Sequence, residues 1–482
     1  MTKLITQAEL SNKQVISKHL SKILNRHSSR FKDVSFREYE MISMSDIHFH
    51  RMDLIDAIAR DLKSIDYRLG TATRKLIRVD KWRVFYEFDL IDRVVMGVLA
   101  EAFNSRLRNL LSTNIHSFLP GRSNVKAVQR AARFVRGHYL RAQSPSEREL
   151  FIWRFDIKSY TDSIPVQEHS PLWHELRSVV FRTFENPEWA FEMLKQGLRP
   201  VFQDHDTFSK ILGKSEENHT PLSGPGMNIV GVTTGTAFAP IAANLYLSKF
   251  DDWLSRQSGF FARYGDDVLY IDRVSAATEK AIKYAREIIT ELGLKPNQKK
   301  EKLMLLTGRG GFSGYQLNYD IGGLKIIPSQ YFDFLGWQIN HRGDYQPNNE
   351  KISRELERIK RRVRNTSRIL QEHSYQDKAN VSFSRDKNLQ ILVEMVSNLR
   401  NYNSCGDVNF TNRQTLRKLS STLQKTLDRH FARFLSSNWT GDRSPRTFRR
   451  LSWSVLVNNF SFKNIQGSFK KSKDRFYRNE KA

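Results

Sequence analysis

Cysteine is nearly absent from this chain of 482 residues, which contains only Cys405. A single thiol cannot form a disulfide within the chain, and it cannot build a cysteine-based zinc site. No stretch approaches the roughly 20 consecutive apolar residues of a membrane-spanning helix. The start of the chain is polar and contains Glu9, so it lacks the apolar core of a signal peptide. We therefore expect a cytoplasmic protein in a reducing compartment, without a membrane partner.

Acidic residues are the second deficit. The chain has 51 aspartates and glutamates against 78 lysines and arginines, a net charge of +27. An excess of this size favours a polyanionic partner, and with no membrane segment nucleic acid is the leading candidate. More than half of the excess lies in residues 346–482, where 29 basic residues face 12 acidic ones, a net +17. Hydrophobic residues make up 39% of the chain, enough to form packed cores.

Apolar periodicity predicts a mixture of helices and strands. Strands are expected at Arg83–Phe88, Phe151–Phe155, Leu324–Ile327 and Phe332–Ile339, and a hairpin within Phe260–Asp272. Helices are expected at Leu90–Leu111, Ala127–Val135, Ala237–Leu254 and Ser275–Leu292, and residues 1–75 also read as helical. After about residue 345 the character changes to basic amphipathic helix, so we place a domain boundary there.

The sharpest local feature is the segment Tyr264-Gly-Asp-Asp267, between two β-prone runs. Two adjacent carboxylates at a hairpin tip repel each other, and a turn needs only one of them. A divalent metal removes that repulsion, and hard oxygen ligands suit Mg²⁺. A solvated turn is the competing interpretation of such a short motif.

A second carboxylate group follows the strand that ends at Phe155. The run places Asp156 at its end, and a turn containing Asp162 comes next. If this strand lies beside the Tyr264–Asp267 hairpin, Asp156 and Asp266 can share two metals, the arrangement used for in-line phosphoryl transfer. Asp162 is better explained as a cap of the turn.

The order and content of seven blocks resemble a reverse transcriptase of the prokaryotic kind, between about Lys81 and Asn340. The blocks are Arg83 with Asp92–Val95, Phe118–Ser123, Asp156–Ile164, Gly231–Tyr246, Tyr264–Asp267, Leu292–Lys300 and Phe334–Trp337. They resemble the two fingers blocks, palm motifs A, B, C and D, and the primer-grip hairpin.

The resemblance implies an α+β right-hand polymerase whose palm is a βαββ-type antiparallel sheet. Residues 1–150 would form an N-terminal extension and fingers, 151–345 the palm with part of the fingers interleaved, and 346–482 a basic helical thumb with a C-terminal extension. It implies an RNA-directed DNA polymerase that adds dNTPs to a 3′-end. Two Mg²⁺ ions, with Mn²⁺ as a substitute, would be held by the catalytic residues Asp156, Asp266 and Asp267.

The same resemblance implies the remaining site residues. Nucleotide binding is assigned to Arg122, Ile157, Tyr160, Thr161, Gly235 and Lys300. Primer or template binding is assigned to Tyr264, Phe334, Leu335, Gly336, Arg361 and Arg362. The expected partners are dNTPs, a DNA product or primer, and an RNA template, for which a dedicated structured noncoding RNA is one candidate. A homo-oligomer is compatible with the sequence.

Three departures from the family pattern are informative. Thr233-Thr234 replaces the usual Pro-Gln of motif B, which normally helps to orient the template base. Thr161 occupies the position of the aromatic residue that blocks a ribose 2′-hydroxyl, with Tyr160 beside it. Phe118-Leu119 replaces the usual Phe-Arg of the second fingers block. These changes resemble the divergent bacterial groups tied to phage defence or abortive infection.

Two alternatives stay open at this point. The first is an untemplated or protein-primed polymerase of the abortive-infection type, including one that uses ribonucleotides. The second is a catalytically silent palm that serves as an RNA-binding scaffold. The three carboxylates argue against the scaffold, because binding RNA does not require their mutual repulsion.

Overall fold

The structure is a computed structural model of the chain. It describes residues 3–24, 34–35, 41–42, 47, 49–65, 67–78, 82–204, 231–307, 312–318, 323–348, 350, 353–354 and 357. The chain divides into two compact units. The first comprises Met1–Ala127, Leu150–Leu305 and Gly314–Ile327, and the second comprises Val128–Glu149, Leu306–Ser313 and Pro328–Ala482.

A six-stranded sheet has the strand order β11-β10-β9-β5-β8-β7. Its strands are β5 (Leu150–Asp156), β7 (Phe260–Tyr264), β8 (Asp267–Asp272), β9 (Lys302–Leu306), β10 (Phe312–Asn318) and β11 (Gly323–Ser329). β8 pairs antiparallel with both β5 and β7. The strand β5 therefore lies directly beside the β7–β8 hairpin.

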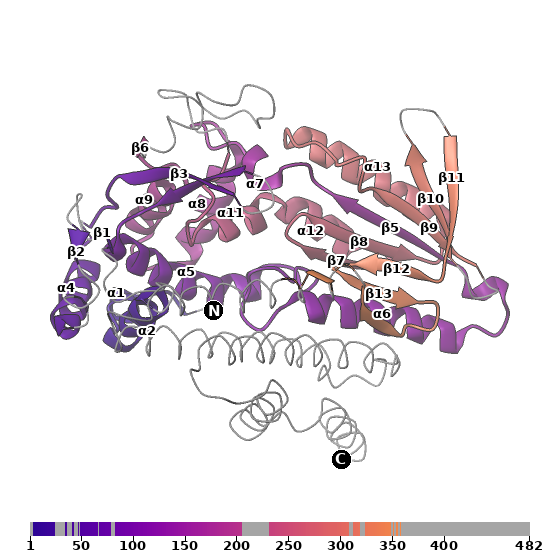
Figure 1. Ribbon diagram of the computed structural model, residues 1–482, viewed down its shortest axis with the longest axis horizontal. Helices are drawn as coiled ribbons and strands as arrows, with labels where there is room; N and C mark the ends of the chain where they lie inside the picture. Colours follow the sequence, from indigo (N-terminus) through magenta and orange to yellow (C-terminus); the bar gives the residue numbers. More distant parts are fainter. Residues whose placement is uncertain are drawn as a thin grey trace, which may run out of the picture. The chain divides into compact units, whose positions relative to one another are not determined.

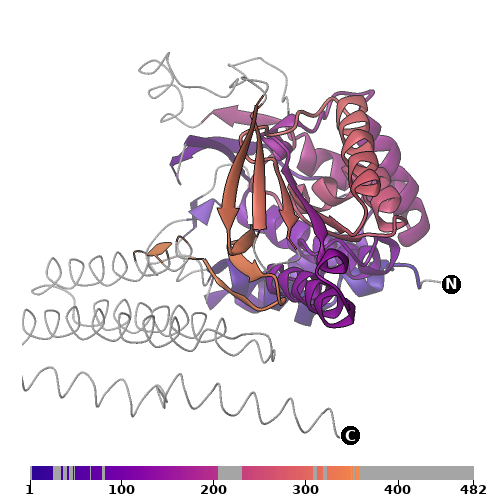
Figure 2. The ribbon, with the colours of Figure 1, turned by 90° about the vertical axis from the view of Figure 1, so that its right-hand side faces the viewer.

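The side chains of β5 and β8, which both lie inside the sheet, are strongly buried. Trp153, Phe155, Val268 and Tyr270 are all at most 1% exposed. The helix α13 (Ser275–Glu291) contacts β5 and β8 and runs along one face of the sheet (Figure 1; Figure 2). Burial of strands on both faces favours the long apolar runs seen in the sequence.

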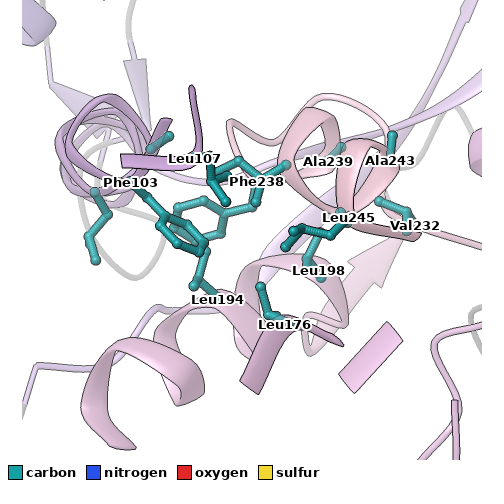
Figure 3. Close-up of a cluster of buried hydrophobic side chains, with 14 of the residues drawn as sticks. Phe103, Leu107, Leu176, Leu194, Leu198, Val232, Phe238, Ala239, Ala243 and Leu245 are labelled. Atoms are coloured by element: carbon teal, nitrogen blue, oxygen red, sulfur yellow. The ribbon is translucent and has the colours of Figure 1, made fainter. Parts of the chain in front are cut away.

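A helical layer builds the core next to the sheet. It contains α5 (Leu90–Leu110), α7 (Tyr160–Ser163), α8 (Pro171–Thr183), α9 (Pro187–Leu198), α11 (Ala239–Tyr246) and α12 (Ser248–Ser255). Side chains from α5, α8, α9 and α11 meet around Phe238 (Figure 3). A Cβ on Gly197 of α9 would lie 2.4 Å from the Phe238 ring, so only glycine fits there.

The rest of the first unit precedes β5 or follows α9. It contains α1 (Gln7–Leu10), α2 (Lys13–Leu24), α4 (Arg51–Lys63) and the strand pairs β1 (Val34–Ser35) with β2 (Met41–Ile42). A three-stranded sheet is formed by β3 (Ala72–Arg78), β4 (Trp82–Glu87) and β6 (Phe202–Asp204), in the order β4-β3-β6. The helices α1, α2 and α4 pack against α5.

The second unit contains most of α6 (Asn124–Arg141), a 3₁₀ turn (Ser146–Arg148) and the antiparallel strands β12 (Tyr331–Phe334), β13 (Trp337–Asn340) and β14 (Tyr345–Pro347). Gln129 donates to the Tyr345 hydroxyl at 3.1 Å. A Cβ on Gly343 would lie 2.4 Å from the carbonyl of Ala132, so the turn before β14 touches the α6 backbone. β14 and the turn before it are thus packed on α6.

Most of the predicted elements are confirmed, but two are divided. The expected strand Phe332–Ile339 is the β12–β13 hairpin, with its turn at Leu335 and Gly336. The predicted helix Ala237–Leu254 is two helices, α11 and α12, which meet at Leu247. Carbonyls in the last turn of a helix lack intrahelical partners. Here Tyr160 donates to the Ala243 carbonyl at 2.5 Å and Arg263 donates to the Asn244 carbonyl at 3.3 Å. These partners, distant in sequence, stabilise the end of α11. The local sequence pattern does not predict them.

Some predictions concern residues outside the described ranges. They include nearly all of the basic segment 346–482, with Arg361 and Arg362. The prediction that residues 1–75 are helical is only partly right, because β3 begins at Ala72. Among the described residues, none of the helices is long and apolar enough to cross a membrane.

The packing of α2 on α5 includes a histidine that makes stability depend on pH. Burial lowers the pKa of His19, although Glu101, 3.0 Å away, opposes the shift. The unfolded chain therefore binds this proton more readily than the folded chain does. We expect the free energy of unfolding to fall as the pH drops from about 7 through the usual histidine pKa of about 6.5.

Urea unfolding of wild type and His19→Gln across this range would measure the contribution. The loss between about pH 7 and pH 5.5 should be smaller in the variant. Equal losses in both proteins would show that His19 does not carry the effect.

Candidate active site

Three aspartates meet where β5 ends and the β7–β8 hairpin turns. Asp156 is the last residue of β5 and pairs with Asp267, the first residue of β8. Asp266 lies in the turn between β7 and β8. One carboxylate oxygen from each residue lies within 4.8 Å of the others. The predicted adjacency of the strand and the hairpin is therefore confirmed.

The turn itself is set by Gly265. Tyr264 pairs with Asp267, which leaves a two-residue loop of Gly265 and Asp266. Gly265 has φ +64° with open space at its missing Cβ, whereas Asp266 has no positive φ. A glycine at the first central position is typical of a type II′ hairpin. Glycine is needed here for its backbone conformation, and Asp266 is then held at the tip.

The negative charge of the cluster is only partly compensated by basic neighbours. Burial raises the pKa of Asp266 to about 6, and the neighbouring charges of Asp156 and Asp267 add to the shift. Burial also raises the pKa of Asp267, while Arg154, whose guanidinium lies 3.5 Å from its Oδ1, opposes that shift. Three close carboxylate oxygens, with raised pKa values at Asp266 and Asp267, suit a divalent cation, which would remove the repulsion. The residues present therefore fit a metal centre.

Asp156 is the most enclosed member, at 2% exposure. Asn297 donates its side-chain N–H to Oδ1 at 2.7 Å, and Lys300 donates to Oδ2 at 2.8 Å. Although burial lowers the pKa of Lys300, the hydrogen bond and charge of Asp156 raise it overall, so the ammonium is kept charged. The predicted nucleotide-binding residue Lys300 thus lies in the site, against a carboxylate.

A buried ion pair contacts the backbone of the β7–β8 hairpin. Arg263 and Asp251 have fully buried side chains, and their closest N–O distance is 2.5 Å. Arg263 also donates to the carbonyl of Gly265 at 2.9 Å. The guanidinium therefore links α12 to the backbone of the catalytic turn.

The residues expected to bind a nucleotide differ in how deeply they are buried. Tyr160 is 4% exposed and its hydroxyl donates to the Ala243 carbonyl, so it packs in the core and offers no surface to a ribose. Ile157 is fully buried and its backbone bridges to Pro296. Thr161 is half-buried and accepts from the backbone N–H of Val232 through its carbonyl. The side chains of Tyr160 and Ile157 are thus packed in the core, and their binding of a nucleotide stays a prediction.

Gly235 and Arg122 also have structural explanations. Gly235 has φ +107°, and a Cβ there would lie 2.5 Å from the Phe85 ring of β4. Gly235 is nevertheless exposed, and its binding of a nucleotide stays a prediction. Arg122 donates to the carbonyls of Ser112, Ile115 and Arg108 at 2.5–2.7 Å, so it caps the end of α5 in place of the predicted triphosphate contact.

The primer and template residues form two groups. Tyr264 is half-buried beside the exposed Phe118, with their ring centroids 6.0 Å apart. Phe334 is fully buried and pairs with Trp337, which corrects the prediction of a primer contact by its side chain. Leu335 and Gly336 form the turn between β12 and β13, both with positive φ. Both turn residues are half-buried, and the Gly336 carbonyl accepts from the Asn348 N–H at 3.0 Å.

Three residues of the site were not predicted from the sequence. Asn297 lies within the motif D block, but nothing in the sequence predicts its contact with Asp156. Arg154 and Arg263 are basic residues inside apolar strand runs. A charged residue is rarely buried without a partner, so their positions in buried strands were the sequence feature that could have identified them. All three act on the catalytic turn or its carboxylates.

Together, the antiparallel palm strands and their three aspartates define a nucleotidyltransferase of the right-hand polymerase class. Residues 74–339 match the family described as "Reverse transcriptase (RNA-dependent DNA polymerase)". This match covers more than half of the chain, so the protein belongs to the reverse transcriptase family.

Solved structures similar to this chain include telomerases. Telomerase from Candida albicans in complex with a TWJ fragment of telomeric RNA shares 14% identity with a TM-score of 0.35, covering 94% of this chain and 74% of that one. Candida tropicalis telomerase in complex with the same kind of fragment shares 13% with a TM-score of 0.40, covering 91% and 70%. The apo Candida tropicalis enzyme, truncated from its C-terminal domain, shares 12% with a TM-score of 0.40, covering 66% and 63%. No curated protein matches the chain.

Proposed function

We propose that this reverse transcriptase copies an RNA template by adding dNTPs to a 3′-end with two Mg²⁺ ions. The three-aspartate cluster at the end of β5 and the tip of β7–β8 carries the proposal. Asp156 and Asp266 would be the main ligands. When bound, the two ions lower the barrier by activating the 3′-hydroxyl and stabilising the leaving pyrophosphate.

The protein residues around the cluster have separate tasks. Arg154 neutralises part of the charge on Asp267, so we assign Asp267 a supporting role. Lys300 has a charged ammonium close to the carboxylates and enough exposure to reach a triphosphate, with 56% of its side chain accessible. We assign the turn of Leu335 and Gly336 to primer binding.

The basic C-terminal segment supports binding of a duplex. Its net +17 over residues 346–482 would bind phosphates without sequence preference, so affinity should fall steeply with salt. We assign residues 1–150 to an N-terminal extension and fingers, 151–345 to the palm, and 346–482 to the thumb. The departures at Thr161 and Thr233-Thr234 support a role in bacterial antiphage defence, with a structured noncoding RNA as template.

The direct test is primer extension with purified protein and Mg²⁺. A primed RNA of defined sequence and a primed DNA of the same sequence would be supplied with all four dNTPs, and the products sequenced. We expect complementary DNA from the RNA template. Products unrelated to either template, or no product at all, would contradict the proposal.

One observation favours a second candidate, untemplated synthesis. The two threonines that replace Pro-Gln are engaged within the protein. Thr233 donates to the Gly197 carbonyl at 2.8 Å, and the Thr234 carbonyl accepts from the Tyr86 N–H at 3.0 Å. Template-free reactions with single dNTPs or NTPs distinguish this candidate, because it predicts product of random order without added RNA.

A further inference from the structure

A short segment after α13 controls both oxygens of Asp156. Residues 295–300 supply one donor to each: the Asn297 amide to Oδ1 at 2.7 Å and the Lys300 ammonium to Oδ2 at 2.8 Å. Each carboxylate oxygen has two lone pairs, so a metal that binds Asp156 through the lone pair facing a donor replaces that donor. Which one it replaces determines which oxygen faces the metal.

The backbone of Asn297 is hydrogen-bonded to the end of β5, the strand that carries Asp156. Its backbone N–H donates to the Asp156 carbonyl at 2.8 Å. Two residues earlier, the Lys295 carbonyl accepts from the Lys158 N–H at 2.9 Å. Pro296 forms a β-bridge with Ile157. The segment therefore continues the sheet next to Asp156 for a short distance. A side chain mounted on such paired backbone keeps its position at little entropic cost.

Lys300 is held far less firmly. Its backbone N–H closes a turn on the Asn297 carbonyl at 2.9 Å. Its long side chain is 56% exposed, whereas that of Asp156 is 3% exposed. A charged ammonium is repelled by an incoming divalent cation, but the neutral amide of Asn297 is not. The flexible cation is thus the donor that a metal displaces.

We propose that Asn297 is a positioning residue that holds Asp156 through Oδ1, and that Lys300 occupies the metal-facing Oδ2 until a divalent ion displaces it. The inference concerns binding of the ion in the absence of nucleic acid. It rests on the metal site of the proposed function but is independent of template choice.

The two donors then have opposite effects on metal affinity. Loss of Asn297 frees Asp156 to rotate, and loss of such supporting contacts typically weakens metal binding 10- to 100-fold. Loss of Lys300 removes a competing cation, so affinity should increase. Because this pair is half-exposed, we expect only about a two- to fivefold increase. A loss of folding would weaken binding in both variants and cannot produce opposite signs.

The experiment measures Mn²⁺ binding to the full chain by electron paramagnetic resonance, without nucleotide or nucleic acid. The variants are Asn297→Ala and Lys300→Ala, with Lys299→Ala as the matched control. Lys299 is exposed and adjacent to Lys300, and its replacement changes the net charge equally. We expect weaker binding for Asn297→Ala, tighter binding for Lys300→Ala, and unchanged binding for Lys299→Ala.

Three results would overturn the inference. They are unchanged affinity in Asn297→Ala, weaker binding in Lys300→Ala, or equal tightening in Lys299→Ala and Lys300→Ala, which would indicate a general charge effect. Failure of the proposed function is seen separately, as normal Mn²⁺ binding without RNA-templated product.

Discussion

Replacing Asp266 by asparagine is expected to lower the rate of nucleotide addition at least about 10³-fold. The substitution keeps the shape of the side chain but removes a charged metal ligand at the hairpin tip. Metal-assisted stabilisation of the reacting oxygens is worth several kcal/mol, and each 1.36 kcal/mol of barrier is about tenfold in rate. Single-turnover primer extension at saturating Mg²⁺ and dNTP would measure the loss.

Asp252→Asn is the matched control for this substitution. Asp252 is an exposed aspartate of α12 outside the metal-binding cluster, so its variant should retain the wild-type rate. If Asp266→Asn extends a primer as fast as wild type, the assigned catalytic site is wrong. If an Asp156→Ala/Asp266→Ala variant retains full biological function, the scaffold alternative is favoured instead.

Asp266→Asn should not destabilise the metal-free protein. Burial and the charges of Asp156 and Asp267 raise the pKa of Asp266 to about 6, so its ionised form is disfavoured in the fold. A neutral amide removes that repulsion. We expect the melting temperature of Asp266→Asn without metal to equal or exceed that of wild type, which would separate lost chemistry from lost folding. Active sites often carry such a stability cost.

The central strands and the three clustered carboxylates were predictable because their signals are local. An apolar run ending in Asp156 and a Gly-Asp pair between β-prone runs specify a strand and a hairpin without distant partners. The adjacency of the two then followed from family order. The structure confirms this part of the site through the pairing of Asp156 with Asp267.

The errors arise where a distant residue decides the local structure. Arg122 faces protein carbonyls because the chain end of α5 needs donors, a demand that the Pro-Gly turn does not reveal. Tyr160 is buried because α11 ends above it. Periodicity describes one segment at a time, so it cannot show which segment satisfies another.

Replacing Arg263 by methionine should destabilise the protein by about 3–5 kcal/mol, because it leaves Asp251 as a buried carboxylate without its partner. Both side chains are fully buried, and Arg263 donates to Asp251 through two nitrogens, at 2.5 and 2.7 Å. Urea unfolding would measure the change. Lys13→Met tests an ion pair with Asp56 whose members are 60% and 48% exposed, and should stay within about 1 kcal/mol.

The double variant Arg263→Met/Asp251→Leu separates the two tasks of Arg263. Removing both charges replaces a costly buried pair with apolar groups of similar size, so much of the lost stability should return. Activity should not return with it, because the Gly265 carbonyl at the catalytic turn still lacks its donor. Recovery of both stability and primer extension would show that Arg263 serves only folding. Stability without activity would place this buried arginine among the residues that hold Asp266 in position.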